Sequence, residues 1–280
     1  MTRVVRHASE LDQWEMFFGA PDPRLCGYVI SYCDYDERTG SFVRRRELPA
    51  DRIVAIMNLG EPIRVCSPGG AWAEHADGFF AGLHDTYAIT ETRGAQRGVQ
   101  IDLTPVGAHL LLRLPMHELA QRVVSLDDLL NRPGRELHER LAHGTSYEER
   151  FSTLDAFFLE RLDDALSPVP SITRALTRIK AAQGDVAIKT ITDELQCSAR
   201  HLNQGFKEQV GITPKLLARI LRFNRAVTLI DTPMSWSAIS YTCGYYDQAH
   251  MIRDFKQFTG SAPTEFALLR LPDGGGVKGD

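Results

Sequence analysis

The sequence lacks the features by which secreted and membrane proteins are usually recognised. Its five cysteines are odd in number and no two have C-x-x-C spacing, which favours free thiols in a reducing compartment over a disulfide framework. The first residues lead into no apolar run of signal length, and no apolar stretch reaches the roughly 18 residues of a membrane span. We therefore expect a soluble, cytoplasmic protein with no membrane partner.

Motifs that carry catalysis or hold a cofactor are missing as well. The sequence has no G-x-S-x-G elbow, no Walker loop and no dinucleotide-binding fingerprint. Its nine histidines include no His-x-His pair of the kind that binds metal in a barrel. His75 and His84 are nine positions apart, with Glu74 beside His75. The sequence therefore predicts no enzyme, no cofactor and no metal site.

Charge is unevenly distributed along the chain. The net charge is −4, yet residues 171–270 carry thirteen Lys and Arg against eight Asp and Glu, whereas residues 1–170 carry eighteen against twenty-six. A basic segment joined to an acidic one hints at a polyanion partner for the basic segment. Ordinary scatter of surface charge is the alternative explanation.

The length of 280 residues and a hydrophobic content of 43 % allow two domains with separate cores. In the first, β-branched and aromatic residues gather in short runs separated by glycine- and proline-rich turns. These runs predict a small antiparallel β-barrel or sandwich, so that the chain as a whole is α+β. The expected strands are 28–32, 52–57, 63–66 and 98–103.

Helices are expected after this β-rich part, where apolar residues recur at three- and four-residue spacing in 116–130, 135–141 and 147–162. Their apolar stripes either cover the barrel or pair two subunits in a homodimer. The first domain, with these helices, is assigned to residues 1–166.

Two prolines in Ser167-Pro-Val-Pro170 forbid a continuous helix, so the domain boundary is placed there. The second domain covers 171–270, and the glycine-rich tail 271–280 is expected to be disordered. Ser171, Ser198, Thr213 with Pro214, and Ser235 are start signals for helices. The expected helices span 172–182, 188–195, 199–209, 215–230, 235–242, 247–258 and 263–269.

Two segments of the second domain, 191–211 and 239–260, follow one pattern. Each reads as a short helix, a tight turn and a second helix in which an apolar residue stands four positions before a Phe-Lys pair. Residues four apart lie on one helix face, so these side chains point inward. A glycine five positions after each Phe ends the unit. The inward pairs are Leu202/Phe206 and Met251/Phe255, and the closing glycines are Gly211 and Gly260.

This layout is typical of a helix-turn-helix, whose second helix enters the major groove of DNA. Arg donates two hydrogen bonds to guanine, Asn and Gln pair with adenine, and Lys and Arg neutralise phosphates. The polar residues left on the outer faces supply this chemistry. They are Arg200, Asn203, Gln204 and Lys207 in the first unit, and Gln248, His250, Arg253 and Lys256 in the second.

A longer signature runs through both units. It consists of Ser198-Ala-Arg-His-Leu, Phe206-Lys-Glu-Gln-Val-Gly, Arg222-Phe-Asn-Arg-Ala, Gly244-Tyr-Tyr-Asp-Gln-Ala-His and Gly260-Ser-Ala-Pro-Thr-Glu-Phe. On these residues, 171–270 resembles the DNA-binding domain of the AraC/XylS family of bacterial transcriptional regulators. The resemblance implies two subdomains joined by the long helix 215–230, with both recognition helices in successive major-groove segments.

The resemblance also implies which residues touch DNA. Departures from the family pattern are Gln204 where Arg is common, the glycine Gly205 inside a helix, and Tyr245 and Met251 where Phe is usual. The implied base-reading residues are Arg200, Asn203, Gln204, Gln248, Ala249, His250 and Arg253. The implied phosphate contacts are Thr190, Lys207, Arg222 and Lys256.

The front part of the chain is only loosely similar to the leading domains of such regulators, which are poorly characterised. A ligand pocket there would be lined by Tyr28, Trp72, Phe80 and Tyr87, unless these aromatic residues simply fill the core.

Three functions remain open. One is a regulator that binds promoter or operator DNA and senses a small-molecule effector, with RNA polymerase as a further partner if it activates. Another is a DNA-binding regulator whose front domain only makes protein contacts. The third is an enzyme with an appended regulatory domain.

Overall fold

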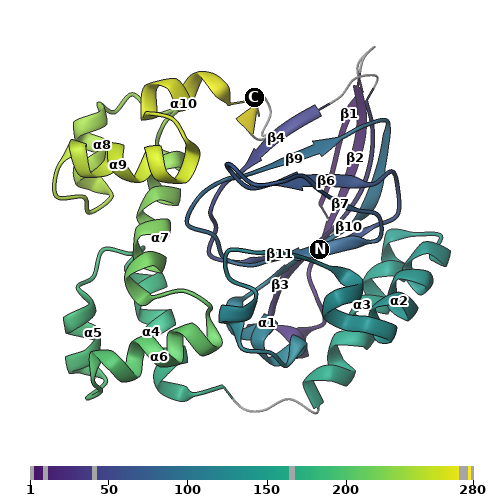
Figure 1. The fold of residues 1–280 in the computed structure, drawn as a ribbon, viewed down its shortest axis with the longest axis horizontal. Helices are drawn as coiled ribbons and strands as arrows, with labels where there is room; N and C mark the ends of the chain where they lie inside the picture. Colours follow the sequence, from purple (N-terminus) through teal and green to yellow (C-terminus); the bar gives the residue numbers. More distant parts are fainter. Residues whose placement is uncertain (1–2, 9–11, 40–42, 164–167, 271–276, 279–280) are drawn as a thin grey trace.

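The computed structural model describes residues 3–8, 12–39, 43–163, 168–270 and 277–278, and consists of two parts (Figure 1). Residues 3–163 form the front domain, in which two antiparallel sheets are flanked by helices. Residues 168–270 form the helical domain, which lies alongside the front domain. The α+β prediction is therefore confirmed, with the sheets open rather than closed into a barrel.

The larger sheet has seven strands in the order β1-β2-β3-β10-β5-β8-β11. Every neighbouring pair is antiparallel, and β10 lies between β3 and β5, so Ile101 pairs with Tyr32 on one side and Ala55 on the other. All three side chains are buried. The strands are β1 (Arg3–Ala8), β2 (Asp12–Gly19), β3 (Val29–Thr39), β5 (Ile53–Asn58), β8 (Gly78–Ala81), β10 (Ala95–Leu103) and β11 (Val123–Ser125).

The smaller sheet has five strands in the order β12-β4-β9-β6-β7. Val277 and Lys278 of β12 pair with Arg46 and Arg45 on the edge of β4. The rest of the tail that was expected to be disordered, 271–276 and 279–280, lies outside the described residues. The strands are β4 (Val43–Glu47), β6 (Ile63–Cys66), β7 (Ala73–His75), β9 (Ala88–Thr92) and β12 (Val277–Lys278).

The expected helix 116–130 is wrong. Met116–Glu118 is a 3-10 turn, Val123–Ser125 is the strand β11 paired with β8, and α2 starts only at Leu126. The β-branched Val123 and Val124 prefer the sheet, and the Ser125 hydroxyl accepts a hydrogen bond from the Asp128 amide as an N-cap. Apolar residues in this segment therefore belong partly to a strand and partly to a helix, so their spacing resembled that of a single helix.

The helices of the front domain lie against the sheets (Figure 1). The stripe residues Leu130, Leu154 and Phe158 are at most 4 % exposed and belong to the main core. The first helix was not predicted, although its N-cap Thr104, followed by Pro105 at the first helical position, is a start signal. Asn131, with φ 53°, kinks the second where a break was expected. The helices are η1 (Pro23–Leu25), α1 (Pro105–Leu112), η2 (Met116–Glu118), α2 (Leu126–His143) and α3 (Tyr147–Asp163).

The helical domain follows the predicted element order closely. Side chains of Ser198, Thr213 and Ser235 cap their helices as expected. Ser171 was expected to cap the first helix, and this is wrong, because Pro170 already occupies the first helical position after Val169. The helices are α4 (Pro170–Ala181), α5 (Ile188–Glu194), α6 (Ala199–Gln209), α7 (Pro214–Thr228), α8 (Trp236–Thr242), α9 (Gln248–Thr259) and α10 (Pro263–Leu269).

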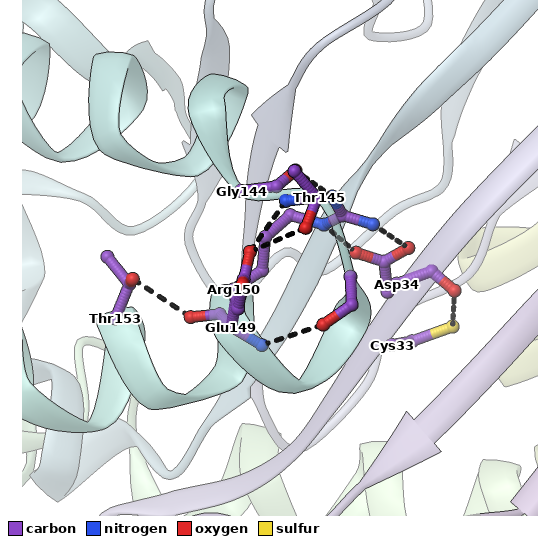
Figure 2. A network of polar contacts seen from close by, with 8 residues as sticks. Cys33, Asp34, Gly144, Thr145, Glu149, Arg150 and Thr153 are labelled. Atoms are coloured by element: carbon purple, nitrogen blue, oxygen red, sulfur yellow. Dashed lines mark hydrogen bonds and ion pairs between the residues drawn. The ribbon is translucent and has the colours of Figure 1, made fainter.

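A buried ion pair fixes the helices α2 and α3 to the larger sheet (Figure 2). The guanidinium of Arg150 on α3 contacts both carboxylate oxygens of Asp34 on β3, one of them at 2.9 Å. It also donates to the carbonyl oxygen of Gly144 at 2.7 Å, in the turn between the two helices. Both charged side chains are at most 7 % exposed, so each depends on the other for compensation of its charge.

Removing one partner of this pair should destabilise the front domain strongly. We expect Asp34→Asn to lower its free energy of unfolding by about 3–5 kcal/mol, because the Arg150 charge stays buried without compensation. Urea unfolding followed by circular dichroism measures this. Arg132→Ala, which removes an exposed ion pair with Glu136 on α2, is the control and should cost less than about 1 kcal/mol. An equal loss of unfolding free energy in the two variants would show that the Asp34–Arg150 pair is not a buried pair on which the fold depends.

Candidate nucleic-acid interface

The first helix-turn-helix unit consists of α5, a turn and α6. Gln196 has φ 50° in the turn, and the Ser198 hydroxyl then caps α6 by accepting from the His201 amide at 3.1 Å. Leu202 and Phe206 are fully buried, as their four-residue spacing predicts. The opposite face is open to solvent. Exposed on it are Arg200, Asn203, Gln204 and Lys207.

The second unit repeats this geometry with α8 and α9. Gly244 makes the turn with φ +74°, a conformation that favours glycine, and the Asp247 carboxylate caps α9 by accepting from the His250 amide at 2.6 Å. Met251 and Phe255 are fully buried. On the outer face Gln248, Ala249, Arg253 and Lys256 are exposed, and His250 is half-buried.

Helix α7 joins the two units and fixes their separation (Figure 1). Its fifteen residues span about 22 Å at 1.5 Å per residue. Phe223 on α7 packs edge-on against Phe255, with 5.0 Å between ring centroids. Arg219 donates to the buried carboxylate of Asp254 on α9 at 2.6 Å. The recognition helix α9 is therefore held on α7 by both an apolar and an ionic contact.

The residues expected to contact phosphates differ in their exposure to solvent. Thr190, Lys207 and Lys256 are exposed and therefore accessible to a backbone phosphate. Arg222 on α7 is only partly exposed, and its guanidinium lies 5.4 Å from the centroid of the Tyr245 ring.

A shallow groove beside the turn of the second unit contains residues that the sequence analysis missed. Arg222 and His250 line it together with Arg225, Tyr241 and Tyr246. The two tyrosines are 86 % and 93 % exposed. The sequence signal available for this groove is the pair of aromatic residues, Tyr245 and Tyr246, directly after Gly244; that Tyr246 is exposed is seen only in the structure.

The pKa of His250 lies below its usual value, which favours the neutral imidazole. Burial is the main cause that lowers its pKa, Asp254 opposes the effect, and Arg222 and Arg253 reinforce it. A neutral imidazole carries one hydrogen-bond donor and one acceptor, which suits the edge of a base better than a phosphate.

The four aromatic residues expected to line an effector pocket have different surroundings. Phe80 is fully buried in the main core, and Tyr28 packs on α1, where its carbonyl oxygen would be 2.1 Å from a methyl group at Gly107. Trp72 lies under the guanidinium groups of two arginines. Tyr87 contacts the helical domain.

A different cavity lies between the two sheets, with a volume of about 280 Å³. Much of its wall is aliphatic. Arg45 and Glu37 also line it, and Arg45 donates two hydrogen bonds to Glu37, at 2.6 and 3.2 Å. Gln96, another lining residue, is 2 % exposed. Within the described part of the chain, the Gln96 Oε1 atom has no hydrogen-bond partner. The apolar lining includes Val54, Ile56, Ile63, Val65, Phe79 and Val123.

No set of three or more His, Cys, Asp or Glu residues within the described ranges is grouped closely enough to hold a metal ion. None of the helices described is both long and apolar enough to cross a membrane.

Comparison with known proteins identifies the class of the helical domain. Residues 191–268 match the family model of a helix-turn-helix domain. The HTH-type transcriptional activator RhaR of Escherichia coli (strain K12) is 32 % identical over 111 residues, which are 38 % of this chain and 39 % of that protein. RhaR of Shigella flexneri serotype 5b (strain 8401) matches with the same figures. The chain thus spans about two fifths of the length of these relatives.

Solved structures with similarity to this chain include ToxT from Vibrio cholerae. Its 1.65 Å structure has a TM-score of 0.46 at 11 % identity and covers 92 % of this chain and 98 % of ToxT. The C-terminal domain of AraT, a response regulator from Geobacillus stearothermophilus, has a TM-score of 0.35 at 24 % identity and covers 38 % of this chain and 90 % of that domain.

The second part of the chain is therefore a DNA-binding domain with two helix-turn-helix units. More narrowly, it is a helix-turn-helix domain of the AraC/XylS type, and the resemblance stated from the sequence is confirmed.

The outer face of α9 should contribute to sequence-specific binding. We expect Arg253→Ala and Gln248→Ala each to weaken binding to a selected DNA site by about 1–3 kcal/mol, because each removes hydrogen bonds to a base edge. Fluorescence anisotropy at fixed salt measures this. Arg132→Ala, on the front domain, should bind as the wild type does. Unchanged binding in both α9 variants would remove that helix face from the site.

Proposed function

We propose that this protein regulates transcription by binding double-stranded promoter DNA with α6 and α9. The observation that carries the proposal is the pair of exposed polar helix faces, one at each end of α7. Arg200 and Asn203 on one face, and Gln248 and Arg253 on the other, have the donors and acceptors that read base edges. The excess of Lys and Arg in residues 171–270 supports binding to the phosphate backbone.

The two faces are proposed to act together on one duplex. A single unit has only a short polar face. When two units are linked by one rigid helix, binding of the first raises the effective concentration of the second at the neighbouring groove, so the pair binds a longer site more tightly. The contacts of Arg219 and Phe223 with α9 keep that linkage stiff. RhaR, which shares this domain, is named as a transcriptional activator, and this supports a role in transcription for the present chain.

Selection of binding sites from a pool of random duplexes by the full chain tests the proposal. Enriched sequences should contain two short conserved blocks, one for each recognition helix. The affinity for such a site should fall steeply as salt rises, because phosphate contacts release counterions. Retention of random and selected duplexes to the same extent at equal salt would refute the proposal.

We further propose that the front domain senses a small effector in the cavity between the sheets. The aliphatic part of the wall favours an apolar body. The charged lining residues, Arg45 and Arg52 against Glu37 and Glu47, balance in number. The Gln96 Oε1 atom, buried and without a partner among the described residues, favours a ligand that carries a hydrogen-bond donor. The effector class is therefore an uncharged, largely apolar small molecule with an N–H or O–H group.

The uncharged fluorescent probe N-phenyl-1-naphthylamine, which has one N–H donor, should bind to the full chain. Thr90→Phe should abolish this binding, because Thr90 lines the cavity and the added ring fills it. Ser152→Phe, which adds the same ring to the exposed face of α3, should leave binding intact. A probe that binds both variants equally well, or that binds no form of the chain, would show that the cavity does not receive such a molecule.

A further inference from the structure

Two buried polar atoms in the wall of the cavity between the sheets lack a hydrogen-bond partner within the described ranges. One is the Gln96 Oε1 atom, already assigned to the proposed effector, and the other is Nε2 of His84, in the segment after β8. A buried polar atom without a partner costs free energy, and a bound molecule that supplies the partner recovers it. The two atoms together therefore restrict the chemistry of the molecule that the cavity receives.

The Gln96 side chain presents an acceptor to the cavity. Its Nε2 atom donates to the carbonyl oxygen of Arg93 at 3.1 Å, in the turn before β10, and this bond fixes the orientation of the amide. The oxygen of an amide accepts hydrogen bonds and cannot donate them. The partner that Gln96 lacks is therefore a donor.

The His84 side chain presents an acceptor as well. Burial lowers the pKa of this imidazole, and a hydrogen bond with the backbone of Arg122 opposes the shift, so the bond is one that the ring donates. Since Nε2 has no partner in the described part of the protein, Nδ1 is the donor and Nε2 of the neutral ring keeps its lone pair. Both unmatched atoms thus need donors from the bound molecule.

The strand registers place the two acceptors at opposite ends of the cavity. Gln96 lies at the start of β10, and Asp102 near its end is six residues away, about 20 Å along an extended chain. Asp102 pairs with Val54 on β5, and Val54 pairs with Ala81 at the end of β8. Strands β8 and β10 run in the same direction, because each is antiparallel to β5. The chain that follows Ala81 therefore leads to His84 in the direction away from Gln96.

The backbone of this segment is itself fixed. The amide of Gln121 donates to the carbonyl oxygen of Leu83 at 3.0 Å, which continues the pairing of β11 with β8 up to the residue before His84. The position of the second acceptor is therefore set by the sheet and not by a free loop.

Apolar side chains line the cavity between these two levels. Ile56 on β5 pairs with Phe79 on β8 and with Gln100 on β10, midway between Gln96 and Asp102. The Gln100 side chain is satisfied, because its Nε2 atom donates to Asp102 at 2.9 Å. The middle of the cavity therefore suits an apolar body.

The arginines of the wall do not favour an anion. Arg45 is paired with Glu37 at 2.6 Å, and Arg52 is paired with Asp102 at 3.2 Å. Each guanidinium thus already has a carboxylate, and a further carboxylate from a ligand would compete with it.

We propose that the cavity binds an elongated, uncharged molecule with a hydrogen-bond donor at each end, one for Gln96 Oε1 and one for His84 Nε2. This proposal deepens the effector class given above and rests on it. Long-chain diols have this chemistry, since an apolar body separates two hydroxyl groups. A molecule with carboxylates at its ends would instead place acceptors against acceptors.

Displacement of N-phenyl-1-naphthylamine from the full chain tests the proposal. The competitors are 1,12-dodecanediol, with a hydroxyl at each end, and 1-dodecanol, with one. His84→Leu and Gln96→Leu should each weaken binding of the diol about threefold to tenfold, because one hydroxyl loses its acceptor. Neither single change should weaken binding of the alcohol, whose one hydroxyl bonds to the acceptor that remains. The double variant should weaken binding of both competitors.

His143→Leu makes the same substitution at the exposed end of α2, so it is the matched control and should leave both affinities as in the wild type. Dodecanedioate, which has acceptors in place of donors, should not displace the probe at concentrations at which the diol does. A diol that binds the wild type, His84→Leu and Gln96→Leu equally well, or a dioate that binds as tightly as the diol, overturns the two-ended site and leaves the proposed effector cavity standing. A probe that binds no form of the chain overturns the effector class, and the two-ended site with it.

Discussion

An apolar pair four residues apart decides which face of each recognition helix meets solvent, and the DNA-binding geometry depends on it. Leu202 with Phe206, and Met251 with Phe255, are fully buried. Because a helix repeats every 3.6 residues, anchoring this stripe turns the polar residues outward in both units. Helix α7 then fixes the orientation of α9 relative to the first unit through the edge-on contact of Phe223 with Phe255 and the Arg219–Asp254 pair. The polar faces of α6 and α9 are thus exposed because the apolar residues on the opposite side of each helix are packed in the core.

The helical domain was predictable because its signals are local. Caps such as Ser198 and Thr213, and the glycines that end each unit, act within one turn of chain and lie where the sequence placed them. The front domain was less predictable. Its strands β1 and β2 have a burial pattern that is mostly exposed or intermediate, without the clean alternation that identifies a strand. In 116–130 strand and helix periods follow each other within ten residues, so a single helix was inferred.

The candidate site likewise has features that the sequence predicts and features that it does not. The exposure of Arg200, Asn203, Gln248 and Arg253 follows from helix periodicity, whereas their contacts with DNA stay a prediction. The cavity between the sheets was not predictable. The four aromatic residues expected to line a pocket do not line it, and its wall combines aliphatic, polar and charged residues of both sheets with Tyr35 and Phe79. Gly205, which lowers helix propensity, finds its reason only in tertiary packing: a methyl group there would lie 2.4 Å from Cδ1 of Ile172 on α4.

The left-handed glycines at the ends of α6 and α9 have a genetic consequence. A side chain at Gly211 or Gly260 would be strained by its backbone and would also collide with the front domain. A screen for alleles that lose promoter occupancy would therefore recover changes at these glycines together with changes on the recognition faces. Neither glycine has a side chain that could contact a base. Such alleles would therefore mark the contact between the two domains, although their phenotype would resemble that of a change in base recognition.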